Sequence, residues 1–228
     1  MNRTYHRRWL RFTKGGKMKY IGHLDLMRVF QSAIRRAKLP IAYSMGFNPH
    51  QRISFAMPLP VGMDSVCEYM ELLLDEPEDI MALGEHLPNG LVPLTSWAIP
   101  ENAPSPAAAV RAVDYRLAFS EVREYKGRIE ELLAAPEIFV TKKTKKGEAT
   151  VDIKPNILAL EYDPVGAVMM RIANNLGPNH IAKLICPDIN SANITRLEIY
   201  GSLRPADMSE IPRASNHALV PLHEAVID

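Results

Sequence analysis

Apolar residues in this chain change their spacing several times, and the order of those changes limits the folds that it can adopt. Alternation of apolar and polar residues predicts a strand at residues 9–13, and a spacing of three or four predicts an amphipathic helix at residues 23–38. Further strands are expected at residues 52–57, 65–74 and 91–99, with a short helix at residues 77–87. The order β-α-β-β-α-β is that of the ferredoxin-like, or split βαβ, unit, in which two helices cover one face of an antiparallel sheet.

A similar order returns in the second half of the chain. Strands are expected at residues 114–119, 156–162, 167–172 and 196–200, helices at 121–134 and 178–185, and extended segments at 137–140 and 148–153 on either side of a basic loop. We therefore expect an α+β fold of two tandem ferredoxin-like halves, each an antiparallel sheet with helices on one face. A Pro-rich connector at residues 100–106 places the halves at 1–100 and 101–204, with an irregular tail at 205–228.

Basic residues gather at the start of the chain. Residues 3–52 hold twelve of the 27 Lys and Arg residues and one carboxylate, that of Asp25, although the net charge of the whole chain is +1. A local excess of this size attracts polyanions, so nucleic acid is the first partner to consider. The alternative is that these side chains cover the solvent faces of a helix and its flanking loops.

Composition excludes several classes of protein. The N-terminus lacks the apolar core of a secretory signal, and no apolar run approaches the roughly 20 residues that cross a bilayer, so we expect a cytoplasmic protein with no membrane partner. Cys67 and Cys186 are the two cysteines, and two thiols alone complete neither a four-ligand zinc site nor an iron–sulfur cluster. We therefore expect no metal and no cofactor.

The first candidate site is the segment YIGHLDLMR, residues 20–28, at the start of the first predicted helix. Gly22 allows a sharp turn, and the free amides of the first helical turn attract anions. His23 and Asp25 would stand beside those amides, with Asp25 as a nucleophile or general base and His23 as an acid or a phosphate contact. The alternative is structural: Asp25 favours the helix dipole and pairs with Arg28 one turn later.

The second candidate site is the loop SMGFNPHQR, residues 44–52. Phe47 could stack on a base, Asn48 offers donors and acceptors to base edges, and Arg52 can bind phosphate through both guanidinium nitrogens, with His50 beside them. The alternative is an ordinary turn, in which Phe47 fixes the loop to the core and His50 faces solvent.

Two further groups of basic residues extend this predicted RNA-binding surface. On the polar side of the first predicted helix, Arg28, Arg35 and Arg36 would grip phosphate. The basic loop near residue 144 would add phosphate contacts that depend on salt and not on sequence. Alternatively, its lysines protect exposed strand edges from aggregation. The candidate lysines are Lys142, Lys143, Lys145 and Lys146, with Lys154 after the returning strand.

Three sequence runs carry a resemblance to a known family. GHLDLMR, YSMGFNPHQRISFAMPLPVG and VDIKP are similar to segments of the uncharacterised radical-SAM-linked domain family, and the resemblance extends to about Gly201. Members of that family stand alone or follow a radical SAM enzyme domain in the same chain. This stand-alone member has no CxxxCxxC run for a [4Fe–4S] cluster, so the resemblance implies that a separate radical SAM protein is its partner.

These observations together favour an RNA-binding or substrate-presenting accessory domain that serves a radical SAM enzyme in tRNA or rRNA modification or processing, and that is not itself the enzyme. One alternative is catalysis by this chain. GHLDL resembles the catalytic-aspartate segment of pseudouridine synthases, with Asp25 as nucleophile, although the residues that usually follow that aspartate are missing. CRISPR-type endonucleases of tandem ferredoxin-like fold are a second analogy. In that case His23 or His50 would be the general base, and a lysine near Lys142 would support the transition state. A third alternative is a protein-binding scaffold. The sequence leaves the oligomeric state open.

Overall fold

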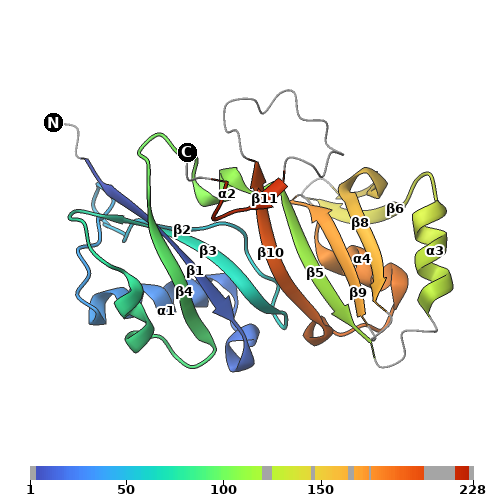
Figure 1. Ribbon diagram of the computed structural model, residues 1–228, viewed down its shortest axis with the longest axis horizontal. Coiled ribbons are helices and arrows are strands. Elements are labelled where there is room, and N and C mark those ends of the chain that lie inside the picture. Colours follow the sequence, from blue (N-terminus) through green and yellow to red (C-terminus); the bar gives the residue numbers. More distant parts are fainter. Residues whose placement is uncertain are drawn as a thin grey trace.

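A computed structural model describes residues 4–119, 125–144, 147–163, 167–174, 176–202 and 219–225 (Figure 1). Its strands are β1 (His6–Lys14), β2 (Ile53–Phe55), β3 (Asp64–Leu74), β4 (Leu91–Ile99), β5 (Ala112–Ala118), β6 (Phe139–Thr144), β7 (Gly147–Asp152), β8 (Ile157–Asp163), β9 (Ala167–Ala173), β10 (Ile194–Ser202) and β11 (Leu219–Pro221). Its α-helices are α1 (His23–Arg36), α2 (Pro106–Ala109), α3 (Lys126–Ala134) and α4 (Pro178–Ile185). Short 3-10 helices are η1 (Gly16–Tyr20), η2 (Met81–His86), η4 (Lys154–Asn156) and η5 (Ser191–Asn193).

One sheet of nine strands runs through both halves of the protein. Its main path is β4-β1-β3-β10-β5-β9-β8, with β2 paired to β3 and β11 paired to β10. The first half has the order β4-β1-β3-β2 and the second half β10-β5-β9-β8, and within each half all pairs are antiparallel. Counted from its own first strand, each half has the order 4-1-3-2. The predicted α+β fold of two tandem ferredoxin-like halves is therefore confirmed.

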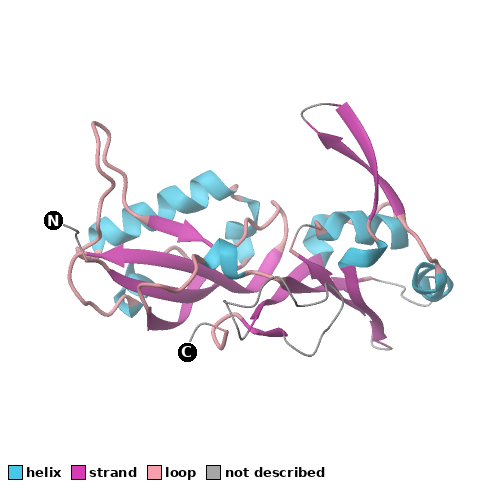
Figure 2. Ribbon diagram, turned by 90° about the horizontal axis from the view of Figure 1, so that it is seen from above, coloured by secondary structure: helices cyan, strands magenta, loops and turns pink. Residues whose placement is uncertain are grey.

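Helices cover one face of this sheet. Figure 2 shows α1 and α4 on the same side, and Figure 1 shows both of them behind the strands. In the first half, Leu26 and Phe30 of α1 pack on Leu10 and Phe12 of β1, and all four side chains are buried. The opposite face of β1, with Trp9, therefore belongs to the other core cluster, which extends into the second half.

Several elements differ from the sequence-based expectations. The helix expected at residues 77–87 is the shorter 3-10 helix η2, and the Asp79 carboxylate before it accepts a hydrogen bond from the backbone N–H of Met81 at 3.0 Å. The extended segments around the basic loop form β6 and β7, a separate two-stranded sheet. Within the tail that we expected to be irregular, residues 219–221 form β11. None of the helices in the described ranges is long and apolar enough to cross a membrane.

A buried ion pair joins the two halves where β3 and β10 run parallel. Arg196 of β10 is fully buried, and its Nη1 donates to both carboxylate oxygens of Glu68 of β3, at 2.9 and 3.0 Å. The same guanidinium donates to the carbonyls of Met57 and Pro58 and to the Tyr115 hydroxyl. One sheet and one buried network therefore cross the junction between the halves. The division into separate units at residue 100 stays a prediction.

Candidate nucleic-acid interface

Much of the basic excess in the first 52 residues is neutralised by carboxylates from outside that segment. Arg7 pairs with Glu71, Arg11 with Glu198 and Lys19 with Asp64. Lys14 is 1% exposed and donates to the Ile21 carbonyl, and burial lowers its pKa. The segment-wide count therefore overstates the basic surface. The exposed excess that is left lies mainly on α1 and just after it, at Arg28, Arg35, Arg36 and Lys38.

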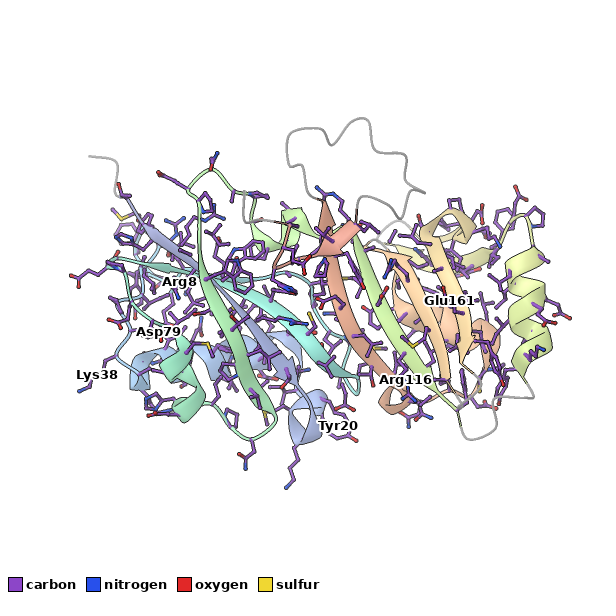
Figure 3. All side chains as sticks on the ribbon, viewed as in Figure 1. Arg8, Tyr20, Lys38, Asp79, Arg116 and Glu161 are labelled. Carbon is purple, nitrogen blue, oxygen red and sulfur yellow. The ribbon has the colours of Figure 1, made fainter. Side chains whose placement is uncertain are left out.

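Helix α1 holds its arginines outward because its other side is buried. Leu26, Phe30, Ala33 and Ile34 form the buried side. The helix ends at Arg36 with Ala37 as its C-cap, and Lys38 then takes the left-handed conformation, with φ of 54°. Figure 3 shows the Lys38 side chain pointing away from the body of the protein. The polar side and the C-terminal end of α1 therefore present positive charge together.

A groove separates this polar side from η2. It has a volume of about 510 Å³ and is lined by Arg28, Val29, Ser32, Arg36, Glu85, His86, Leu87 and Pro88. Arg28, Ser32 and Arg36 are four residues apart and so lie on one stripe of the helix. Arg36 Nη2 donates to the His86 carbonyl, and Arg35 Nη2 donates to Ser32 Oγ at 3.1 Å. The structure thus brings the three predicted arginines to one groove and its rim.

The two candidate catalytic residues lie at the other end of α1. Asp25 accepts a hydrogen bond from Arg28 at 2.8 Å in a pair whose side chains are 59% and 73% exposed. The His23 ring makes an edge contact with Phe55, at 5.3 Å between ring centroids. Within the described part of the chain, no hydrogen bond joins His23 to Asp25. The geometry therefore matches the structural reading of Asp25, a helix-start carboxylate paired one turn on.

The loop at residues 44–52 projects from the protein with its aromatic side chain in solvent. Its neck is closed by hydrogen bonds from the Ser44 amide to the His50 carbonyl at 2.8 Å and from the His50 amide to Ser44 Oγ at 2.9 Å. Phe47 is fully exposed, and Asn48 and His50 are exposed as well. Arg52 lies over the Tyr5 ring, 4.6 Å from its centroid. Phe47 therefore does not fix the loop to the core.

The lysines predicted around residue 144 divide into three groups. Lys142 is half-buried on β6, and its charge and that of Lys183, after the larger effect of burial, lower the pKa of His180 on α4. Lys143 also lies on β6, whereas Lys145 and Lys146 lie outside the described residues. Lys154 donates to the carbonyls of Leu132 and Leu133 at 2.8 and 2.7 Å, so it caps the C-terminal end of α3.

Both projecting segments rise from the helix-covered side of the sheet. In Figure 2, the loop that leads into β2 stands at one end of the molecule and the β6–β7 hairpin at the other, with α1 and α4 between them. The exposed arginines of α1, the exposed Phe47 and Lys142 therefore belong to one side of the protein. We call this the helical side.

A second polar cluster lies on the opposite face of the sheet, and the sequence analysis missed it. Glu198 Oε1 accepts hydrogen bonds from Cys67 Sγ at 2.7 Å, from the Tyr69 hydroxyl at 3.0 Å and from the Ile199 amide at 3.0 Å. Its Oε2 accepts from Arg11 Nη2 at 2.7 Å. Burial, reinforced by Glu198, raises the pKa of Cys67 to about 12, and burial likewise raises the pKa of Tyr69.

The signal for this cluster was present but dispersed. Arg11 and Glu198 are charged residues in the middle of predicted strands, a position that normally needs a partner. They pair with each other, and the further partners of Glu198 are Cys67 and Tyr69 of β3, far away in sequence. The described residues contain no group of three His, Cys, Asp or Glu side chains close enough to hold a metal ion.

Comparison with known families finds one family whose model covers most of this fold. Residues 7–183 match the model of a family described as an uncharacterized protein conserved in bacteria (DUF2344). The chain belongs to this family. The match runs from β1 to the last turns of α4, so it includes α1, the 44–52 loop and the β6–β7 hairpin. Both β10, which completes the second half, and β11 follow the matched region. No curated protein matches the chain.

Proposed function

We propose that the protein is an RNA-binding or substrate-presenting accessory domain that works with a separate radical SAM enzyme in tRNA or rRNA modification or processing. The observation that carries the proposal is the helical side. There a fully exposed Phe47 stands on a projecting loop, Arg28 and Arg36 of α1 line one groove, and the exposed Arg35 lies beside it. Exposed aromatic rings stack on unpaired bases, and arginines bind the phosphates that follow them.

The exposure of Phe47 favours a role in recognition, because the ring is not buried in the fold and so does not stabilise it. An aromatic ring left in water forgoes the free energy that burial would give. The short Asn48–Pro49 bend does not require that ring. Stacking on a nucleobase would bury both of its faces and stabilise a complex by about 1–3 kcal/mol per base.

The radical SAM partner rests on a different argument. The sequence runs quoted above resemble the radical-SAM-linked domain family, and this chain lacks the cysteines for the cluster itself. In this proposal the partner supplies the radical chemistry, and this chain supplies binding energy and orientation for the RNA. Catalysis by Asp25 receives no support from its exposed pairing with Arg28.

The test is binding of the purified protein to total tRNA and to rRNA fragments at several salt concentrations. Reversal of Arg28, Arg35 and Arg36 to Glu should abolish tight binding and flatten the salt dependence, because each lost phosphate contact removes about 0.7–0.9 from the slope of log K against log salt. Arg116→Glu is the matched control for Arg35→Glu, since Arg116 is an exposed arginine on β5, away from the helical side (Figure 3). Equal loss in the two single variants would refute the proposed surface.

A further inference from the structure

Two cavities lie on either side of η2 and meet at its end. The first is the groove between α1 and η2 that Arg28 and Arg36 line. The second is a pocket of about 310 Å³ between η2 and the start of β4. Leu87 and Pro88, which follow η2, line both cavities. A ligand that crosses these two residues can therefore occupy the groove and the pocket at once.

The walls of the pocket are apolar. Among the described residues that line it, none is charged and Asn89 alone has a polar side chain. Its apolar side chains are those of Met81, Leu87, Pro88, Leu91, Val92 and Pro93. Small-molecule sites are typically apolar cavities of about this size with a few polar groups that fix orientation. A nucleobase suits such a pocket, since apolar side chains cover its ring faces and one amide can bind its edge.

Gly84 keeps this pocket open. It lies on η2 and lines the pocket, and a Cβ atom at this position would be 3.6 Å from the Cγ and Cδ atoms of Pro93. That distance is ordinary van der Waals contact, so the fold accepts a methyl group there. A larger side chain would fill the space between η2 and β4. Residue 84 therefore offers a way to close the pocket without changing the arginines of the groove.

The groove offers several hydrogen-bond donors to one anion. Arg28 Nη1 donates to Asp25, and Arg36 Nη2 donates to the His86 carbonyl. A guanidinium has five N–H donors on three nitrogens, so both arginines keep donors for a ligand. Ser32, between them on the same stripe, adds a hydroxyl. A terminal phosphate, with three acceptor oxygens and a charge of about −1.5 to −2, matches this set better than an internal phosphate with one charge.

We propose that the groove and the pocket together form a binding site for one nucleoside 5′-phosphate. The phosphate would lie against Arg28, Ser32 and Arg36. The ribose would cross Leu87 and Pro88, so that the base enters the pocket. Either a free nucleotide or the 5′-terminal nucleotide of an RNA has this chemistry. This site deepens the proposed function and rests on it, because the phosphate would occupy the groove that we assign to RNA.

Isothermal titration calorimetry with three probes tests both parts of the site. Adenosine 5′-monophosphate (AMP) carries a base and a phosphate, ribose 5-phosphate lacks the base, and adenosine lacks the phosphate. We expect AMP to bind about tenfold or more tightly than either fragment, because it alone fills both cavities. Equal affinity for AMP and ribose 5-phosphate would overturn the base site. Equal affinity for AMP and adenosine, or no AMP binding at millimolar concentration, would overturn the site as a whole.

Gly84→Leu should fill the pocket and weaken AMP binding about tenfold or more, whereas ribose 5-phosphate, which does not enter the pocket, should bind as before. Ala82→Leu is the matched control, because Ala82 is an exposed residue of η2 outside the linings of both cavities. If Gly84→Leu folds poorly, Gly84→Ala adds only a methyl group and should weaken AMP binding about two- to fourfold. Native AMP affinity in whichever of these Gly84 variants folds would overturn the proposal.

Glu85 allows a test by gain of binding. It is the one carboxylate among the described residues that line the groove. Glu85→Gln should tighten the binding of AMP and of ribose 5-phosphate about two- to fivefold, because it removes a repulsion between exposed charges. Unchanged or weaker binding of both ligands would contradict a phosphate in the groove.

A short single-stranded RNA with a 5′-phosphate distinguishes the two sources of the nucleotide. If Gly84→Leu weakens the binding of this RNA as well as that of AMP, the ligand is the 5′-terminal nucleotide of RNA. If it weakens AMP binding alone, the ligand is a free nucleotide. Salt-dependent tRNA binding without AMP binding would refute this site and retain the proposed function, whereas AMP binding without tRNA binding would do the reverse.

Discussion

Replacing Arg196 with Met should lower the free energy of unfolding more than replacing any exposed charged residue. The Arg196 side chain is 0% exposed and that of Glu68 is 4% exposed, so the substitution leaves a buried carboxylate without its counter-charge. Removing one partner of such a pair costs about 3–5 kcal/mol of unfolding free energy. For a chain of 228 residues, that loss corresponds to a fall in Tm of roughly 6–20 °C.

The double variant Arg196→Met/Glu68→Leu distinguishes the loss of the ion pair from the cost of leaving the Glu68 carboxylate buried without a partner. With both charged groups gone, the apolar replacements fill the site without an unpaired ion, so most of the lost stability should return. Arg28→Met is the matched control, because its pair with Asp25 is exposed and contributes only about 0–1 kcal/mol. Urea unfolding followed by circular dichroism measures all three variants.

The pH dependence of Arg196→Met adds a second check. Burial raises the pKa of Glu68 even beside Arg196. Without the arginine this pKa rises further above the unfolded value of about 4.3. A carboxyl with a raised folded pKa favours folding at low pH and loses that contribution as pH rises through the folded value, so the deficit should be largest near pH 7 and shrink on acidification. A deficit under 1 kcal/mol at pH 7, or one that grows on acidification, would refute this reasoning.

Three further predictions follow from single side chains. Phe47→Ala should weaken RNA binding about 5- to 150-fold, the equivalent of one lost base stack, with no change in Tm because the ring is fully exposed; unchanged affinity in a binding titration would exclude stacking. The pKa of His180, lowered by burial and by nearby lysines, should rise in an NMR titration when RNA covers the helical side, and a constant pKa would remove that region from the footprint. Iodoacetamide at pH 8 should leave Cys67 unmodified in the folded protein, since burial raises its pKa to about 12, and alkylate it after unfolding; mass spectrometry that finds native Cys67 modified as fast as the half-buried Cys186 would contradict its burial.

Sequence patterns predicted the elements well where one periodicity was sustained. Helix α1 starts at the predicted residue and ends within two residues of the predicted end, because its buried and exposed sides alternate with a helical period. The strand order was not predictable in the same way. Pairing of β3 with β10 depends on packing between segments about 130 residues apart, and the local spacing of apolar residues cannot predict it.

The candidate site shows the same division. Helical spacing placed Arg28 and Arg36 on one stripe, and the structure finds both lining one groove. Charge counting failed for Arg7, Arg11 and Lys19 because their carboxylate partners lie on β3 and β10, far away in sequence. It failed for Lys14 because that side chain is buried and donates to the Ile21 carbonyl. The cluster around Glu198 was missed for the same reason: its members come from β1, β3 and β10, which lie far apart in the sequence.

The most direct test of the proposed RNA-binding surface is the salt dependence of tRNA binding for the native chain, Arg35→Glu and Arg116→Glu. These two substitutions change the net charge equally but lie on different sides of the protein. We predict that Arg116→Glu retains the native slope of log K against log salt, whereas Arg35→Glu weakens binding and reduces the slope by about 0.7–0.9. Identical slopes for all three proteins, or no salt-dependent binding at all, would contradict the proposal that the helical side binds RNA.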